Sequence, residues 1–465
     1  MRTLIADITR KAGEIVTIQG WVDNRRDHGK LIFIDVRDRS GVAQVVCTPE
    51  KQCREIAQEV RGEWVVSITG IVNKRPDKMV NPGLETGTVE IEATEVLVLN
   101  QSQTTPFSVA TDGKELDESI RLQYRYLDLR RARLQKNIRT KANMMQYIRT
   151  KLSAQDFVEI ETPLLTKSTP EGARDFIVPS RIEPGSFYAL PQSPQQYKQL
   201  LMVAGFERYM QFARCMRDED TRGDRQPEFT QLDMEMSFVE REDVMAVNEK
   251  LLIDLVTDLF PHKKIQEIPF PRITYKEAME KYHSDRPDIR TDKQDPDLLA
   301  FCWVIDFPFF EKTETGGWTF THNPFSAAIP EHRGHLVAKE HIGEILTTQY
   351  DIVLNGFEIG GGSIRNHTAQ GLTKVLEIMG HTTENIMKNF GHMLEAFSYG
   401  APPHGGIAWG FDRLVMLLLN EPNIREVIAF TKTGEGRDLM MNAPSAVEKA
   451  QLDELHLKIV EPKNK

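Results

Sequence analysis

The stretch RCMRDEDTRGDRQPEF, residues 214–229, decides the fold class of this chain. It begins inside an apolar run, Tyr209–Cys215, and ends where a second apolar run, Phe229–Phe238, begins, so it predicts two strands joined by a charged loop. The loop contains three arginines and several acids, which can bind phosphates bidentately and hold a purine by its edge. A surface ion-pair network is the alternative interpretation of this loop taken alone.

Two other segments combine glycines with an arginine. In NGFEIGGGSIR, residues 355–365, three consecutive glycines let a ligand approach the backbone, and Arg365 offers a fork for a carboxylate. In GGIAWGFDRL, residues 405–414, Arg413 stands just inside a helix start, where it can meet the phosphates of a nucleotide. A tight bulge and an ion pair with Asp412 are the respective alternatives. The sequence has neither a P-loop nor a dinucleotide fingerprint.

The N-terminal part of the chain is β-rich. The 465 residues suffice for two or three domains, and the first of them contains five apolar or alternating runs with a short helix, Glu50–Val60, after the third. This is the element order of an OB-fold barrel, which commonly binds oligonucleotides, although the fold alone leaves the ligand open. The five runs are Ile15–Val22, Leu31–Val36, Val42–Cys47, Trp64–Val72 and Val89–Leu99.

The rest of the chain reads as a mixed α/β domain built on a substantial sheet. Residues 105–131 are polar and then basic, and we expect a hinge there. From Leu134 the apolar residues recur at helical spacing and predict a long amphipathic helix. Further strand-like runs are Phe157–Ile160, Phe187–Leu190, Cys302–Asp306 and Asp351–Ile359; helical runs are Gln195–Gly205, Arg241–Leu259 and Thr382–Tyr399, and a last apolar run is Ile407–Leu419.

Composition and charge narrow the classes of protein. With 40% hydrophobic and 27% charged residues, the chain is typical of globular proteins, and it has no secretory signal and no run long enough to span a membrane. Its four cysteines (Cys47, Cys53, Cys215, Cys302) are scattered, which argues against a disulfide framework or a zinc site and fits a reducing cytoplasm.

The net charge of −10 does not exclude an RNA ligand, because phosphate contacts depend on local basic patches. One such patch is Arg25, Arg26 and Lys30, and a second is the basic stretch at residues 121–141. A solvated charged face is the alternative interpretation of each.

Taken in order, several of these segments resemble the signature motifs of the class II aminoacyl-tRNA synthetases. FVEIETP, residues 157–163, is similar to the first motif, whose proline lies at the dimer interface in that family. The charged loop at 214–229 is similar to the second motif, and residues 405–414 are similar to the third.

Three further stretches are similar to one family of subclass b, the bacterial-type aspartyl-tRNA synthetases. Residues 169–175 resemble the loop that closes over aspartate, and residues 192–198 resemble the aspartate-binding strand and helix. Residues 25–38 resemble the anticodon-binding barrel, so the resemblance spans nearly the whole chain.

This resemblance implies an α/β (α+β) architecture and a two-step ligase reaction. The expected parts are a five-stranded OB-fold anticodon-binding barrel at 1–104, a hinge at 105–131, and a class II catalytic domain at 132–465 whose central antiparallel sheet is flanked by helices. The expected reaction activates L-aspartate with ATP to aspartyl-adenylate and transfers aspartate to the 3′ end of tRNA-Asp. Mg²⁺ as cofactor, a homodimer without a membrane partner, and a cytoplasmic location are also implied.

By matched position, the resemblance implies a role for each of the following residues. Arg217, Glu219 and Arg413 would be catalytic, through positioning and charge stabilisation. The same three would bind ATP together with Asp218, Gln226, Phe229, Glu358, Gly410, Phe411 and Asp412, and Asp351 and Glu358 would hold Mg²⁺. Glu171, Ser193, Gln195, Lys198, Arg217, Asp233, His322 and Arg365 would bind aspartate, and Arg25, His28, Phe33 and Gln44 would read the anticodon. For Phe33, a core aromatic is the alternative.

Selection of aspartate would rest on Lys198 and Arg365. Both would pair with the side-chain carboxylate of the substrate, and Asp233 would orient Lys198. Asparagine has the same shape but would leave both cations unpaired.

The chain departs from its family at three places. Bacterial members carry an extra domain of roughly a hundred residues, and here a short linker at about 286–300 stands in its place. Asn323 occupies the second position of a pair that is usually two histidines, which leaves its role open. His28 is typical of members that charge both tRNA-Asp and tRNA-Asn, which leaves tRNA-Asn open as a second acceptor.

Other functions remain as alternatives. An asparaginyl- or lysyl-tRNA synthetase would share both domains, although Lys198 and Arg365 would repel a lysine substrate. A catalytically inactive tRNA-binding paralogue is opposed by Arg217, Glu358 and Arg413, and a free-standing asparagine synthetase by the N-terminal barrel.

Overall fold

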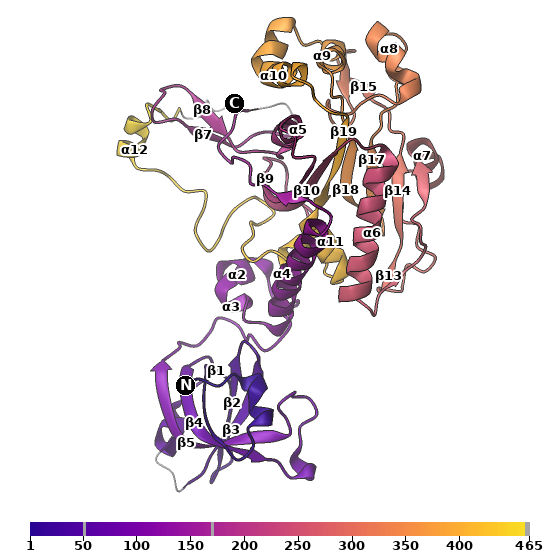
Figure 1. Ribbon diagram of the computed structural model, residues 1–465. Coiled ribbons are helices and arrows are strands. Elements are labelled where there is room, and N and C mark those ends of the chain that lie inside the picture. Colours follow the sequence, from indigo (N-terminus) through magenta and orange to yellow (C-terminus); the bar gives the residue numbers. More distant parts are fainter. Residues whose placement is uncertain (50–52, 169–171, 461–465) are drawn as a thin grey trace. The chain divides into compact units, whose positions relative to one another are not determined.

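Two compact units, Met1–Lys114 and Glu115–Lys465, make up the protein (Figure 1). The computed structural model describes residues 1–49, 53–168 and 172–460. The expected hinge at 105–131 is divided between the units, because its second half forms helices α2 (Glu118–Gln123) and α3 (Arg125–Asp128) of the larger one. Within the described ranges, no helix is both apolar enough and long enough to cross a lipid bilayer.

The smaller unit is the expected five-stranded barrel. Its strands close in the order β1-β2-β3-β5-β4, with helix α1 (Cys53–Glu59) following β3. Alternate residues along each strand are buried, and they form a core of valines and isoleucines. The strands are β1 (Ile15–Asp27), β2 (Ile32–Asp38), β3 (Gly41–Cys47), β4 (Val65–Lys74) and β5 (Val89–Asn100).

The larger unit is built on an eight-stranded sheet with the order β12-β14-β17-β18-β19-β10-β9-β6. Its inner pairs are antiparallel as expected, but both edge pairs, β12 with β14 and β6 with β9, are parallel, so the sheet is mixed. The strands are β6 (Val158–Glu159), β9 (Arg208–Met216), β10 (Glu228–Ser237), β12 (Arg272–Thr274), β14 (Phe301–Ile305), β17 (Tyr350–Leu354), β18 (Phe357–Ile364) and β19 (His404–Gly410).

Helices pack on this sheet and bury its main core. Figure 1 shows α4 (Ala132–Ser153) and α6 (Arg241–Leu259) running together along the sheet, and apolar side chains of both join those of the central strands in one cluster. The other helices are α5 (Gln195–Val203), α7 (Tyr275–Tyr282), α8 (Arg333–Ala338), α9 (Ala369–Ile378), α10 (Thr383–Ser398), α11 (Phe411–Leu418) and α12 (Lys449–Glu454). Three short ribbons complete the unit: β7 (Ile177–Pro179) with β8 (Phe187–Ala189), β11 (Lys264–Ile265) with β13 (Leu298–Leu299), and β15 (Phe310–Lys312) with β16 (Trp318–Phe320).

One expected strand is in fact a hairpin. The run 351–359 contains a turn at Asn355 and Gly356, whose φ angles are 52° and 86°, and this turn separates β17 from β18. Asn-Gly favours such left-handed turn conformations, which match the twist of antiparallel strands. In the same way the run 407–419 changes from strand β19 to helix α11 at Phe411.

The basic stretch at 121–141, a candidate phosphate-binding patch by sequence, is in part a buried ion-pair network. Asp128 accepts hydrogen bonds from Arg121, Arg125 and Arg131, at 2.7 Å for the latter two. Arg121 also makes a bidentate pair with Glu426, at 3.0 and 2.7 Å. All five side chains are buried, so these arginines stabilise the larger unit and are not available to phosphates.

The expected linker at about 286–300 is held by its neighbours. The Gln266 side chain donates to the carbonyl of Ile289 and accepts from the backbone N–H of Thr291, at 3.1 and 2.8 Å. Near its end the linker contains β13, which pairs with β11, and its described residues between α7 and β13 form no helix or strand.

Candidate active site

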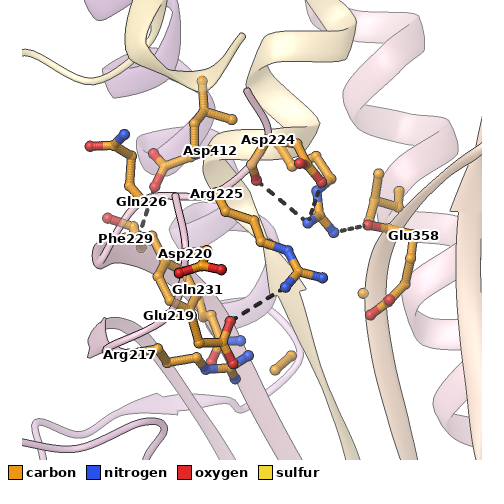
Figure 2. Close-up of a pocket in the computed structure, with 17 residues that line it drawn as sticks. Arg217, Glu219, Asp220, Asp224, Arg225, Gln226, Phe229, Gln231, Glu358 and Asp412 are labelled. Atoms are coloured by element: carbon orange, nitrogen blue, oxygen red, sulfur yellow. Dashed lines mark hydrogen bonds and ion pairs between the residues drawn. The ribbon is translucent and has the colours of Figure 1, made fainter. Parts of the chain in front are cut away.

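A first cavity, of about 230 Å³, opens between the charged loop, β18 and the start of α11 (Figure 2). The loop joins β9 to β10, as the sequence predicts, and it supplies most of the charged walls. The charged lining residues are Arg217, Glu219, Asp220, Asp224, Arg225, Glu358, Asp412 and Arg413. A cavity with both signs of charge and one aromatic wall, Phe229, suits a nucleotide.

Arg413 ties the charged loop to the central sheet. Its guanidinium donates to the Asp224 carboxylate at 3.0 Å and to the carbonyl of Glu358 (Figure 2). Arg413 is thus held at the cavity wall by groups from two separate elements, which places a fixed positive charge there.

Arg217 and Phe229 lie together in the wall of this cavity. The guanidinium carbon lies 5.2 Å from the centroid of the Phe229 ring, a cation–π contact. Glu219 and Arg225 face each other across the cavity mouth at 3.4 Å (Figure 2). Both partners of this pair are partly exposed, so a ligand can separate them at little cost.

Four of the residues expected to touch ATP make internal contacts. Phe411 is fully buried and packs edge-on against Phe212, because it lies on the core side of α11. Asp412 pairs with Lys141 and accepts from the backbone N–H of Thr230 at 2.8 Å, so both its oxygens are used.

Gln226 and Asp218 are also turned to other partners. The Gln226 amide bonds to both backbone groups of Lys432, at 2.8 and 3.2 Å, and so ties the charged loop to the C-terminal segment. Asp218 points away from the first cavity, toward Arg174 at 3.6 Å. The sequence alone could not show that these four residues are held by other parts of the protein, whereas other expected ATP-binding residues are exposed in the cavity wall.

A second cavity, of about 270 Å³, adjoins the first, and Arg217, Gln231 and Glu358 line both. All the expected aspartate-binding residues that the structure describes line it: Ser193, Gln195, Lys198, Arg217, Asp233, His322 and Arg365. Glu171 lies outside the described residues. The structure thus brings together residues from positions 193 to 365 of the chain.

Lys198 and Arg365 converge in this cavity on one carboxylate, Glu235. Arg365 makes a bidentate pair with Glu235 at 2.9 and 3.1 Å, and Lys198 lies 3.4 Å from the same group. Lys198 also donates to Asp233 at 2.6 Å. The side chains of both cations are at most 3% exposed, so the two charges are held away from bulk water.

The electrostatics of this cluster keep Glu235 charged. Burial alone would raise the pKa of Glu235, but Arg365 and Lys198 outweigh it and hold the pKa below its ordinary value. For Asp233, burial prevails over the attraction of Lys198 and raises the pKa. Two cations and two acids therefore form a nearly neutral buried cluster beside the cavity.

Glycine at position 406 makes the cluster possible. Gly406 lies in β19, paired to Glu235 on one side and Ser363 on the other. A Cβ atom there would be 2.1 Å from Glu235 Oε2, so any side chain would block the path from Glu235 across β19 to Arg365.

Asp351 and Glu358 are the candidate metal ligands on the second cavity wall. Burial, followed by the charge of Glu358, raises the pKa of Asp351 well above its ordinary value of 3.8. Two carboxylates that repel each other at one cavity suit a hard divalent cation such as Mg²⁺. Within the described ranges, no three His, Cys, Asp or Glu residues are arranged to hold a metal ion, so Mg²⁺ would also need oxygens of a ligand.

Sequence reasoning missed Glu235, Gln231 and Gln349 as site residues. Gln231, Asp233 and Glu235 alternate along β10, so they share one face of the strand. That period of two was the signal that could have added Glu235 and Gln231 once Asp233 was chosen. Gln349 stands outside any motif and carries no such signal.

The barrel presents the expected anticodon residues on its outer surface. Phe33 points outward between the buried residues Ile32 and Ile34, so it is not the core aromatic of the alternative interpretation. His28 lies edge-on to its ring at 5.5 Å.

The other two residues expected to read the anticodon, Arg25 and Gln44, bond to neighbouring groups of the barrel. Arg25 donates to the carbonyl of Ala57 at 2.9 Å, and Gln44 to Glu90 at 3.2 Å.

Comparison with known proteins places both units in families. Residues 117–434 match the family model of tRNA synthetases class II (D, K and N), and residues 16–99 match the OB-fold nucleic acid binding domain. The chain is 41% identical to the aspartate–tRNA(Asp/Asn) ligase of Rubrobacter xylanophilus, over 97% of this chain and 95% of that one. It is 39% identical to the aspartate–tRNA ligase of Staphylococcus aureus, over 96% and 97%.

A solved structure with the same fold is the asparaginyl-tRNA synthetase of Entamoeba histolytica, with a TM-score of 0.76, 23% identity, and coverage of 94% of this chain and 98% of that one. The alignment to the Rubrobacter protein extends over 582 positions, which exceeds the 465 residues of this chain by 117. The family prediction made from the motifs is confirmed: the chain belongs to the class II tRNA synthetases of the D, K and N type, and among them to the family of the bacterial aspartate–tRNA ligases.

Proposed function

We propose that the protein is an aspartate–tRNA ligase, which activates L-aspartate with ATP and transfers it to the 3′ end of tRNA. The observation that carries this proposal is the convergence of the buried side chains of Lys198 and Arg365 at a cavity that adjoins the first one. Its aspartate-binding, ATP-binding and anticodon residues are those named above, with Phe411, Asp412, Gln226 and Asp218 as positioning residues.

The unused hydrogen-bond donors of the two cations favour aspartate over asparagine. A guanidinium has five N–H donors, and Arg365 uses three of them on Glu235 and Ser363. Each terminal nitrogen keeps one donor for a ligand. Because lysine and arginine offer no acceptors, the guest must present oxygens to both, and the amide –NH₂ of asparagine would face N–H groups.

The two cavities set the order of the reacting groups. ATP in the first cavity has its base near Phe229 and Glu219 and its phosphates near Arg413 and Arg217. An aspartate α-carboxylate oxygen attacks the α-phosphorus, and the bond to the pyrophosphate oxygen breaks. Arg217 lines both cavities and stabilises the charge that develops at this junction. In the second step the terminal tRNA hydroxyl attacks the acyl carbon, and AMP leaves.

The metal ligands, the linker and the cellular location belong to the same proposal. Asp351 and Glu358 would hold Mg²⁺, which neutralises charge on the phosphates when bound. The linker at about 286–300 stands in place of the insertion domain, and the 117 excess alignment positions support this. We also place the enzyme in the cytoplasm, which the scattered positions of its four cysteines suit.

The direct test is ATP–pyrophosphate exchange with purified protein. Exchange is expected with L-aspartate and to be at least about a hundredfold weaker with L-asparagine. Exchange that depends on asparagine, or its absence with both amino acids, would refute the proposal. Charging of tRNA-Asp and tRNA-Asn transcripts then decides whether one or both are substrates, as the names of the relatives leave both outcomes open.

Replacing Phe33 with alanine is expected to raise the KM for tRNA about 5- to 100-fold, because one base–aromatic stack contributes about 1–3 kcal/mol. The side chain lies on the outer face of the barrel, so pyrophosphate exchange should not change. Phe33→Tyr keeps the ring and should keep the KM. A KM unchanged in Phe33→Ala would remove Phe33 from the tRNA interface.

A homodimer would cover the apolar surface around β6. Val158, Leu164 and Leu165 are 43%, 46% and 54% exposed and lie in or next to the first motif. Sedimentation velocity should give twice the chain mass, and Leu165→Asp should shift the protein toward the monomer. A monomer at micromolar concentration for the unmodified protein would contradict this part of the proposal.

A further inference from the structure

The candidate metal ligand Asp351 is the last acceptor in a chain of hydrogen bonds that begins at the backbone N–H of Phe325 and passes through Asn323 and Gln349. The Gln349 amide nitrogen donates to Asp351 Oδ1 at 2.7 Å. The Gln349 amide oxygen accepts from Asn323 Nδ2 at 3.2 Å, and Asn323 Oδ1 accepts from the backbone N–H of Phe325 at 3.0 Å. All three bonds donate in the same direction, toward Asp351.

The first bond fixes the direction of the whole chain. The Phe325 backbone N–H can only donate, so it assigns the oxygen of the Asn323 amide and leaves its –NH₂ facing Gln349. Gln349 must then present its oxygen to Asn323 and its –NH₂ to Asp351. A reversed Gln349 would bring its oxygen against the carboxylate, so only one orientation satisfies every group.

The surroundings keep this arrangement rigid. The Gln349 side chain is buried, and Ser326 Oγ reaches both amide oxygens, at 3.2 Å from Asn323 and 3.4 Å from Gln349. Across the strand pair, a Cβ at Gly361 would lie 2.6 Å from Asp351 Oδ1. The absence of a side chain at position 361 therefore gives the Asp351 carboxylate its place beside Gln349.

We propose that Asn323 and Gln349 are positioning residues that orient Asp351 for a divalent cation. This inference rests on the proposed function, in which Asp351 and Glu358 hold Mg²⁺. The bond from Gln349 to Oδ1 restricts the rotation of the Asp351 carboxylate, and Asp351 lines the same cavity as Glu358. Hydrogen bonds to a ligating carboxylate of this kind set its orientation and so its affinity for a metal. Asn323, which stands where the family pattern has a second histidine, would thus orient Gln349 and, through it, Asp351.

The test measures metal binding directly. Mn²⁺ alone serves as the probe, and its binding to the full-length protein is followed by the loss of the free-ion electron paramagnetic resonance signal. Gln349→Met keeps the volume and removes both polar groups, and it is expected to raise the Mn²⁺ dissociation constant about 10- to 100-fold. Asn323→Ala should raise it less, and Asn323→His, which restores a ring N–H donor, should bring it back toward the wild-type value.

A matched control comes from Ser326→Ala. Ser326 belongs to the same buried cluster, but its single O–H can donate to only one of the two amide oxygens at a time. The Phe325 backbone N–H already sets the direction of the chain, so Mn²⁺ affinity should stay within about twofold in Ser326→Ala. An effect of Ser326→Ala as large as that of Gln349→Met would mean that general loosening, not orientation, is at work, and would overturn the inference. Unchanged Mn²⁺ affinity in Gln349→Met would overturn it as well.

Kinetics separate positioning from simple damage. In Gln349→Met the Mg²⁺ concentration for half-maximal pyrophosphate exchange should rise, while kcat at saturating Mg²⁺ should return to within about twofold of wild type. A lowered kcat at every Mg²⁺ concentration would contradict a positioning role. Lack of aspartate-dependent exchange in the wild-type protein would instead refute the proposed function, whereas the Mn²⁺ measurement reports on Gln349 independently of activity.

Discussion

Replacing Arg365 with methionine is expected to lower kcat/KM for aspartate about a thousandfold. Loss of one partner of a buried, hydrogen-bonded charge pair costs about 2–5 kcal/mol, and here the partner is also the fork that faces the substrate. ATP binding should be little changed, because Arg365 does not line the first cavity. The measurement is aspartate-dependent pyrophosphate exchange, with ATP affinity determined by equilibrium binding.

A second variant separates lost recognition from lost folding. Arg365→Met alone takes from the fully buried Glu235 its bidentate partner and leaves Lys198, at 3.4 Å, as the ion-pair partner that the described residues provide, and this costs stability as well as activity. In Arg365→Met/Glu235→Gln the uncompensated charge is gone, so the midpoint of urea unfolding should recover while aspartate activation stays low. Recovery of activity in the double variant would mean that Arg365 acts through structure and does not contact the substrate.

Replacing Asp128 with asparagine is expected to destabilise the larger unit by about 3–5 kcal/mol, because it leaves several buried arginines without their shared anion. Urea unfolding followed by tryptophan fluorescence measures the change, since Trp303 and Trp409 are buried in that unit. Asp254→Asn is the matched control, because Asp254 pairs with the exposed Lys250 on α6 and should cost less than about 1 kcal/mol. Equal effects of the two variants would contradict the prediction.

The same network predicts acid lability. Burial would raise the pKa values of Asp128 and Glu426, but the surrounding arginines outweigh it and hold both below their ordinary values of 3.8 and 4.5. Groups with a depressed pKa in the folded state stabilise it above the unfolded-state value and lose that contribution as the pH falls through the folded value. Stability of the larger unit should therefore decline below about pH 4.5. Asp128→Asn should show a smaller decline than the unmodified protein.

The parts of the fold that the sequence predicted are those with a local signal. Alternation marks the barrel strands, and α6 was predicted with the bounds it has, Arg241–Leu259, because its apolar face has a helical period. The turn at Asn355 and Gly356 also carried a local signal, the Asn-Gly pair, but the apolar run around it hid the hairpin.

Site residues could be predicted where they belong to a motif or follow the period of a strand. Contacts between residues far apart in the sequence could not be predicted. The resemblance to the family implied that Lys198 and Arg365 serve one cavity, and both line it. Glu426 lies about three hundred positions from Arg121, so nothing local marked them as partners or showed that this basic stretch is buried. Gly406 belongs to a motif, but the sequence does not show why glycine is required there. Only the structure shows that the Glu235 side chain crosses β19 at this position.

The barrel and the catalytic unit bury separate sets of side chains, and none of the described core clusters draws on both. A mutation that loosens one unit therefore leaves the interior of the other intact. The sequences of the nucleic-acid-binding surface and of the active site can therefore change at different rates during evolution. One unit can be replaced or altered by selection while the other keeps its sequence and structure.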